Sequence, residues 1–159
     1  ALRERMARLA AEKADSLITA TAGKAAVIIM GDFNSTPDDP LMELLTKDSG
    51  FVSLSASEAG QGKGSYRYQG TWEMIDQVLV SQAMTDSSAV WHVHQGCLKV
   101  VDAPFLLTDD ETYPGKKPFP TYGGYRYSGG YSDHLPVVIR INHSSKVSDL
   151  GSQASSFRP

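Results

Sequence analysis

Hydrophobic residues in the first part of the chain follow two different periods. Large apolar residues recur near the helical period over residues 1–22, and Gly23 suits the end of a helix. These apolar positions are Leu2, Met6, Leu9 and Leu17. Residues 25–30 form a continuous apolar run, which predicts a buried strand. A second helix is expected to begin at Pro40, with Asp38 or Asp39 as its cap.

From Gly50 onward the pattern predicts short strands. The expected strands cover residues 51–54, 66–68, 74–80, 89–94 and 135–141. Gly70-Thr71 is expected to join the second of these strands to the third. Residues 103–131 are rich in Pro, Gly and Tyr and lack periodicity, which predicts a long loop of the kind that often carries function.

Helices and short strands together predict an α+β fold. We expect one domain over residues 1–142 and a polar, Ser-rich tail over residues 143–159. The 159 residues are 41% hydrophobic and 21% charged, which is typical of a globular protein, and no apolar stretch approaches transmembrane length. A net charge of -3 argues against a strong, sequence-independent grip on nucleic acid, but it does not exclude a nucleic acid substrate.

Two polar motifs lie at the ends of predicted core strands. Gly31-Asp32-Phe33-Asn34 follows the first strand, and Ser132-Asp133-His134 precedes the last. If both strands belong to one core, carboxylates, an amide and an imidazole converge at one rim, and this mixture suits hydrolysis of a phosphate ester. The alternative is ordinary turn chemistry, because Gly, Asp and Asn all favour turns.

Asp76 lies inside the otherwise apolar stretch 74–80, where an unpaired charge is costly. A histidine that acts on phosphate needs an orienting partner, and we predict that Asp76 orients His134. The alternative is an aspartate that faces solvent on an edge strand.

Aromatic and basic residues cluster in the chain just before Asp76 and again just before Asp133. The candidates for substrate contact are Arg67, Trp72, Tyr125 and Arg126. Aromatic faces with interleaved cations suit base stacking and phosphate contact. The alternative is that these rings pack on their own scaffold.

Taken together, these motifs resemble the endonuclease/exonuclease/phosphatase superfamily, the DNase I-like fold, over roughly residues 1–142. The resemblance implies that Asp32 orients or deprotonates the attacking water and that Asn34 holds a phosphoryl oxygen. It further implies that Asp133 lies near a Mg²⁺ or Mn²⁺ ion, and that His134, held by Asp76, contacts the scissile phosphate.

The chain departs from the family pattern in length, because members are usually about twice as long. The Asn and the principal metal-binding Glu of the first half have no counterpart here. We therefore expect the C-terminal half of a four-layer α/β/β/α sandwich, with a missing N-terminal half as its partner. Such a half would expose one face of its sheet, so we expect homo-oligomers through that face and poor catalysis by the isolated chain.

The resulting functional hypothesis is metal-dependent phosphodiester hydrolysis, with nucleic acid as the expected substrate. The alternatives are a lipid or inositol-phosphate phosphodiesterase or phosphatase of the same superfamily, and a non-catalytic binding module. Bacterial proteins with these motifs are often exported, which leaves an extracytoplasmic location open.

Overall fold

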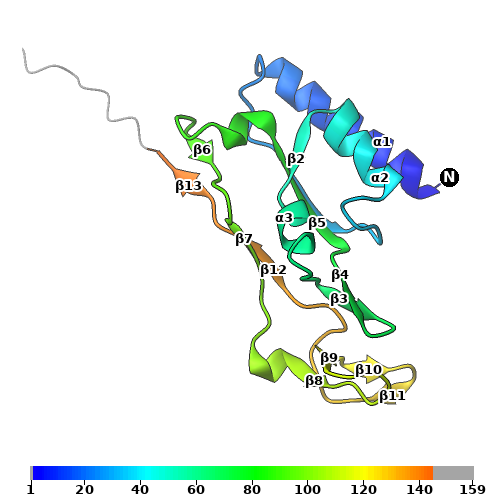
Figure 1. The fold of residues 1–159 in the computed structure, drawn as a ribbon. Helices are drawn as coiled ribbons and strands as arrows, with labels where there is room; N and C mark the ends of the chain where they lie inside the picture. Colours follow the sequence, from blue (N-terminus) through cyan, green and yellow to red (C-terminus); the bar gives the residue numbers. More distant parts are fainter. Residues whose placement is uncertain (1, 145–159) are drawn as a thin grey trace, which may run out of the picture.

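The computed structural model describes residues 2–144 and shows an α+β fold with mostly antiparallel strands in small sheets (Figure 1). This confirms the predicted fold class. The first elements are α1 (Leu2–Ala20), β1 (Ile28–Asp32), α2 (Pro40–Glu43), η1 (Leu44–Asp48), β2 (Phe51–Ser53) and α3 (Ser55–Ala59). The Asp39 side chain caps α2 by accepting a bond from the Leu41 amide at 2.8 Å, as one of the two predicted candidates.

A three-stranded antiparallel sheet in the order β1-β5-β2 forms the centre of the molecule, with β5 spanning Asp76–Ser81. Ile28 of β1 lies opposite Val80 of β5, and the register ends with Asp32 opposite Asp76. The predicted first strand therefore begins three residues later than expected and continues into the polar motif. This register places two carboxylates side by side at one end of the sheet.

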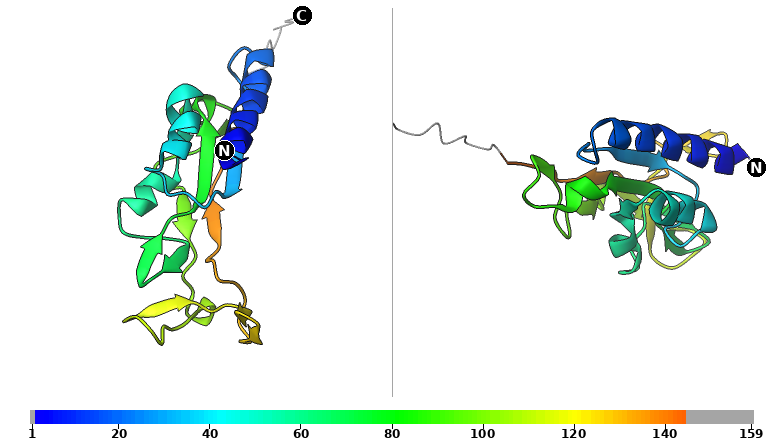
Figure 2. Two further views of the ribbon diagram at one scale, coloured as in Figure 1. Left: turned by 90° about the vertical axis from the view of Figure 1, so that its right-hand side faces the viewer. Right: turned by 90° about the horizontal axis from the view of Figure 1, so that it is seen from above.

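Helices α1 and α2 cover the same face of this sheet (Figures 1 and 2). The residues of α1 that enter the core are Ala7, Ala11 and Ala14. The large apolar residues that predicted the helix are exposed instead, with Leu2 at 71% and Met6 at 61%. Alanines favour helix and have small side chains, so α1 can lie close to the sheet. The helix was therefore predicted correctly, but from large apolar residues that do not face the core.

A second core cluster joins the sheet to the strand pair β7 (Leu98–Val100) and β12 (Val137–Ile139). Val78 of β5 packs with Leu98, Val100 and Leu135 on the face that α1 and α2 do not cover. Cys97 belongs to a third cluster with Val80, behaving as the small buried apolar residue that its sequence context suggests. These clusters fix β12 against β5 and so fix the residues that precede β12.

The strand predicted over residues 66–68 is present, but it pairs with a separate short strand before β5 and not with the predicted strand 74–80. Strands β3 (Tyr66–Tyr68) and β4 (Thr71–Glu73) pair through a turn at Gln69 and Gly70, both with positive φ. The predicted strand 74–80 therefore begins only at Asp76. Met74 and Ile75 are buried without being in a strand, so their hydrophobicity reports burial and not an extended pairing.

Residues 103–131 are not the structureless loop that was predicted. They contain η3 (Pro104–Leu106), a hairpin of β8 (Leu107–Asp109) with β9 (Lys116–Pro118), and a hairpin of β10 (Tyr122–Gly123) with β11 (Arg126–Tyr127). These short strands expose most of their side chains, so no hydrophobic period marks them. The two hairpins form a lobe at one end of the molecule (Figure 1).

At the other end, β6 (Trp91–His92) pairs with β13 (Asn142–His143), after the short helix η2 (Gln82–Thr85). Residue 143, predicted to open the tail, therefore takes part in pairing, and residues 145–159 lie outside the described residues. Among the residues that the structure describes, no helix has the length and apolar character needed to cross a membrane.

Candidate functional site

The predicted partnership of Asp76 and His134 is present. His134 Nδ1 lies 2.7 Å from Asp76 Oδ2, and the two side chains are 24% and 22% exposed. A carboxylate at this distance accepts the Nδ1 proton, which leaves Nε2 as the ring nitrogen available to a ligand. The arrangement fixes both the ring orientation and the tautomer of His134.

Ser65 completes this pair and was missed in the sequence analysis. Its side chain is fully buried, and its hydroxyl donates to the same Asp76 Oδ2 at 2.5 Å. The hydroxyl also accepts a bond from the Asp76 backbone amide at 3.3 Å. Ser65 therefore holds both the side chain and the main chain of Asp76. A serine in the Gly- and Ser-containing stretch before β3 carries no distinguishing sequence signal.

The local backbone brings His134 to this position. Ser132 Oγ accepts a bond from the His134 amide at 3.1 Å, which forms a turn just before β12. The Leu135 amide donates to the Ser65 carbonyl at 2.7 Å, and a β-bridge links Tyr66 to His134. The Tyr66 ring lies 4.8 Å from the imidazole, centroid to centroid. Tyr66 of β3 and Ser65 just before it therefore hold the backbone and the ring of the histidine in place.

Asp32 and Asn34 lie at the end of β1 and contact each other. The Asn34 backbone amide donates to Asp32 Oδ1 at 2.8 Å, and the Asn34 side-chain Nδ2 donates to Asp32 Oδ2 at 3.2 Å. Asn34 has φ of 48°, so the extended conformation of β1 ends before this residue. The turn, and not strand alternation, brings the two side chains together.

The two motifs meet at one rim, as the sequence analysis predicted. Asp32 lies opposite Asp76 in the β1–β5 register, and Asp76 contacts His134 directly. A hollow of about 270 Å³ lies beside Asp76 and His134 and is also lined by Met30, Gly31 and Ser132, whereas Asp32 and Asn34 do not line it. Asp133 is exposed next to His134 and has no described contact that ties it to the other four residues.

The donor set within residues 2–144 does not by itself fit a divalent metal ion. No three carboxylate, imidazole or thiol side chains of these residues gather closely enough to hold one. Both oxygens of Asp32 accept bonds from Asn34, and Asp76 Oδ2 is shared between Ser65 and His134. Hard cations require several oxygen ligands. A complete metal site therefore needs ligands from outside this stretch.

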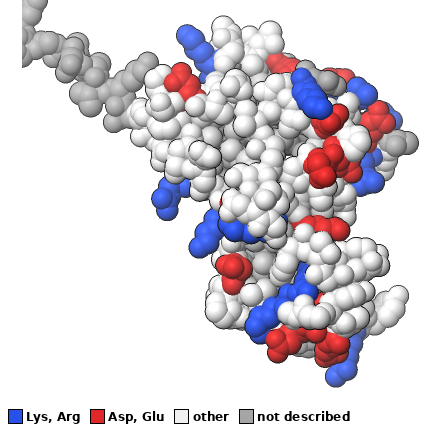
Figure 3. Space-filling model, in the orientation of Figure 1, with Lys and Arg blue, Asp and Glu red and all other residues white. Residues whose placement is uncertain are grey.

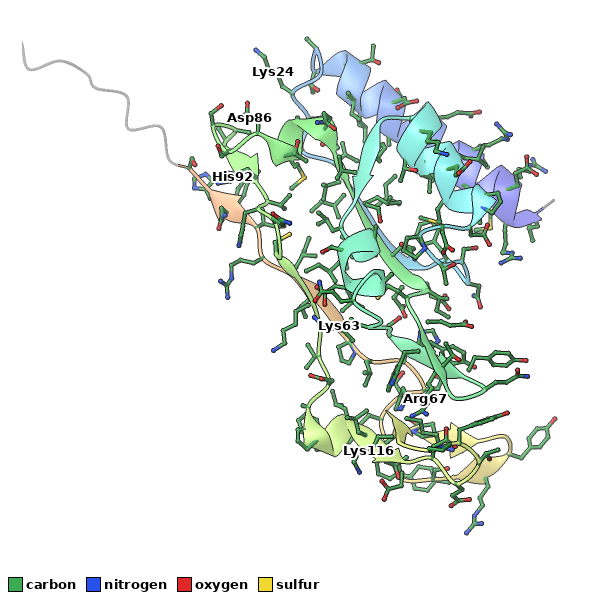
Figure 4. All side chains as sticks on the ribbon, in the orientation of Figure 1. Lys24, Lys63, Arg67, Asp86, His92 and Lys116 are labelled. Carbon is green, nitrogen blue, oxygen red and sulfur yellow. The ribbon has the colours of Figure 1, made fainter. Side chains whose placement is uncertain are left out.

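Arg67 occupies a different position from the one predicted for substrate contact. Its side chain is only 6% exposed, and its guanidinium donates to the carbonyls of Pro114 and Lys116 and lies near Asp110. Figure 4 shows Arg67 between the β3–β4 hairpin and the lobe that carries Lys116. Arg67 therefore ties the lobe to the hairpin that supports His134, and it belongs to the scaffold and not to the substrate surface.

The remaining three predicted contact residues divide into two places. Trp72 lies under the Arg67 guanidinium at 5.8 Å and lines a hollow of about 460 Å³ with Lys63, Lys99 and Lys116. Tyr125 and Arg126 are exposed on the β10–β11 hairpin. The substrate role of these three residues stays a prediction.

Comparison with known proteins agrees with this geometry. A model of the endonuclease/exonuclease/phosphatase family matches residues 1–143. No curated protein and no solved structure matches the chain. The family match spans both polar motifs and the strand that carries Asp76. With its two motifs at one rim and this match over nearly all of its described residues, the chain belongs to the endonuclease/exonuclease/phosphatase family.

Proposed function

We propose that this chain supplies the histidine-bearing part of a phosphodiester-hydrolysing site. Proteins of this family are generally hydrolytic enzymes, and typically they use divalent metal ions. The observation that carries the proposal is the hydrogen-bonded array of Ser65, Asp76 and His134, in which Asp76 occupies Nδ1 and leaves the other imidazole nitrogen without a partner among the described residues. A histidine that contacts a phosphoryl oxygen needs its ring held in one orientation, and this array holds it.

In this proposal His134 acts on the phosphate itself. With Nδ1–H donated to Asp76, a protonated ring presents Nε2–H to a phosphoryl oxygen. That donor stabilises the negative charge that builds up on the oxygen as water attacks phosphorus. Asp76 acts as a positioning residue, because it holds the ring and balances its charge.

Asp32 and Asn34 are proposed to act on the other side of the phosphate. The Asp32 carboxylate retains lone pairs beyond the two bonds from Asn34, and these can orient a water or accept its proton. One N–H of the Asn34 side-chain amide donates to Asp32, and its other N–H can donate to a phosphoryl oxygen.

We also propose that hydrolysis depends on Mg²⁺ or Mn²⁺, with Asp133 as one contributor. Residues 2–144 lack a complete ligand set, so the residues that finish the site come from elsewhere, as expected for the partner half. The same consideration predicts that residues 1–159 alone are a poor catalyst. Vigorous Mg²⁺-dependent cleavage by this chain alone would contradict that.

Nucleic acid is the substrate that we favour among phosphodiesters. The β10–β11 hairpin, which precedes Ser132-Asp133-His134 in the chain and exposes tyrosine rings, supports it, since exposed rings suit the stacking of bases. A non-catalytic binding module is the less favoured alternative, because such a module has no need for a hydrogen-bonded Ser65–Asp76–His134 array. Lipid and inositol-phosphate substrates share the phosphate chemistry, and the motifs alone do not separate them.

The test is hydrolysis of bis(4-nitrophenyl) phosphate by the full-length protein that carries this chain, with Mg²⁺ or Mn²⁺ present. Replacing His134 with Ala should reduce kcat by about 10²- to 10⁴-fold. His143→Ala is the matched control, because His143 packs on Trp91 at the far end of the molecule and should leave kcat unchanged. A wild-type rate in the His134 variant would overturn the proposal.

A further inference from the structure

The β10–β11 hairpin presents tyrosine rings to solvent. Tyr122 and Tyr127 face each other across the hairpin with ring centroids 5.5 Å apart in an edge-to-face arrangement. Tyr125 at the turn is fully exposed, and Tyr122 and Tyr127 are each at least 60% exposed. Rings that already touch one another form a stacking surface whose side-chain entropy is partly lost before any ligand binds.

This hairpin is attached firmly to the segment that carries His134. The Tyr131 amide donates to the Phe119 carbonyl at 2.7 Å, and Thr121 Oγ1 donates to the Tyr131 carbonyl at 2.6 Å. A Cβ at Gly130 would lie 2.3 Å from the Phe119 carbonyl oxygen, so only glycine allows this approach. Two residues beyond Tyr131 the chain reaches Asp133. A short, hydrogen-bonded segment therefore joins the hairpin to the rim.

The composition of the lobe favours a nucleic acid over a lipid surface. Residues 112–132 contain Lys116, Lys117 and Arg126 and no acidic residue, in a chain whose net charge is -3. No Leu, Ile, Val or Met occurs over residues 108–134, whereas elements that insert into membranes rely on Leu, Phe and Trp. The exposed rings of the β10–β11 hairpin are all tyrosines, and Phe105 of η3 is the exposed phenylalanine of the lobe.

Electrostatic attraction at long range is not the main source of affinity. Lys116 and Lys117 face Asp109 and Asp110, while Arg126 makes no ion pair with any residue that the structure describes. Acidic and basic side chains are interspersed over the face shown in Figure 3, including the lobe. Binding must therefore depend on ring stacking, with Arg126 adding a local contact to phosphate.

We propose that the tyrosines of the β10–β11 hairpin stack the bases of a single-stranded nucleic acid, whose backbone runs on toward His134. This inference rests on the proposed function for its substrate class. Bases in a duplex already stack on their neighbours, so exposed rings of this kind select unpaired strands. Arg126, between two of the tyrosines, contacts the backbone phosphate.

The test is the affinity of the 159-residue chain for a fluorescent single-stranded oligonucleotide, measured by anisotropy without metal, so that no cleavage occurs. Tyr125→Ala should weaken binding about tenfold, and Tyr125→Phe should bind as the wild type does, because the ring and not the hydroxyl stacks. Trp91→Ala is the matched control, since Trp91 is also an exposed ring but lies at the opposite end of the molecule (Figure 1). A duplex of the same sequence should bind more weakly than the single strand.

Several results would overturn the inference. These are equal affinity of wild type and Tyr125→Ala, equal affinity for duplex and single strand, or no binding of the oligonucleotide. Tyr125-dependent binding to phosphatidylcholine vesicles in place of the oligonucleotide would assign the surface to a lipid. The proposed hydrolysis is tested separately. If His134→Ala left catalysis unchanged while the tyrosines still bound the strand, the proposed function would fail and this inference would stand.

Discussion

Replacing Ser65 with Ala isolates the role of the buried hydroxyl that contacts the Asp76–His134 pair. The change removes a 2.5 Å bond to the Asp76 carboxylate and leaves the Asp76 amide, previously bonded at 3.3 Å, without that partner. A hydrogen bond to a charged group contributes about 1.5–3 kcal/mol. We therefore expect the free energy of unfolding to fall by about 2 kcal/mol in a denaturant titration.

Ser55→Ala is a close control for this variant. Ser55 is also fully buried, and its hydroxyl also contacts β5, but through the Val78 amide at 2.9 Å and the Asp76 carbonyl. Both variants should lose stability. Only Ser65→Ala should also lower kcat for phosphodiester hydrolysis, by about tenfold, because about 1 kcal/mol or more of its effect falls on the carboxylate that holds His134. Equal kcat values in the two variants would refute the idea that Ser65 positions Asp76.

Three further predictions follow from exposed, charged and buried groups. The chain should self-associate through its uncovered apolar residues, including Met30 at 57% and Val138 at 47% exposed, and Met30→Lys should reduce the mass found by light scattering; a wild-type monomer would contradict this. The pKa of Asp110 is lowered from 3.8, mainly by the hydrogen bond from the Thr112 backbone amide and further by Tyr113, Lys117 and Arg67. The ionised Asp110 therefore stabilises the lobe fully above pH 3.8, and this stabilisation is lost as the pH falls through the lowered pKa. The pH dependence of the Thr112 amide NMR shift should show this, and Asp110→Asn should remove it. Burial raises the pKa of the Cys97 thiol, so alkylation of the native protein should be slow and should become fast in denaturant; rapid native labelling would count against a buried thiol.

The proximity of the two polar motifs could be predicted from the sequence because both motifs lie near strand ends. An apolar run followed by Gly-Asp-Phe-Asn, and an Asp within a buried strand, each have few structural explanations, and a carboxylate in that setting needs a partner. The Asp76–His134 contact at 2.7 Å is that partner. Ser65 had no comparable signal, because a buried serine is distinguished only by the tertiary contacts around it.

The positions of Arg67 and of helix α1 could not be read from local pattern. Arg67 is buried because the 110–116 turn folds over it and offers carbonyls, which is a long-range arrangement. Helix α1 packs through alanines and leaves Leu2 and Met6 exposed, so periodicity predicted the helix but not which side faces the core. A partner that covers those larger residues would reconcile the pattern with the packing.

The most direct test of the central claim follows the ring nitrogens of His134 by ¹⁵N NMR while a dinucleoside monophosphate is added to the chain. If this histidine contacts a phosphodiester, its Nε2 resonance should shift to saturation while Nδ1 keeps the signature of a proton held by Asp76, and the ring of His143 should not respond. Saturable phosphodiester binding that leaves the His134 nitrogens unmoved, or no binding at all, would contradict the account.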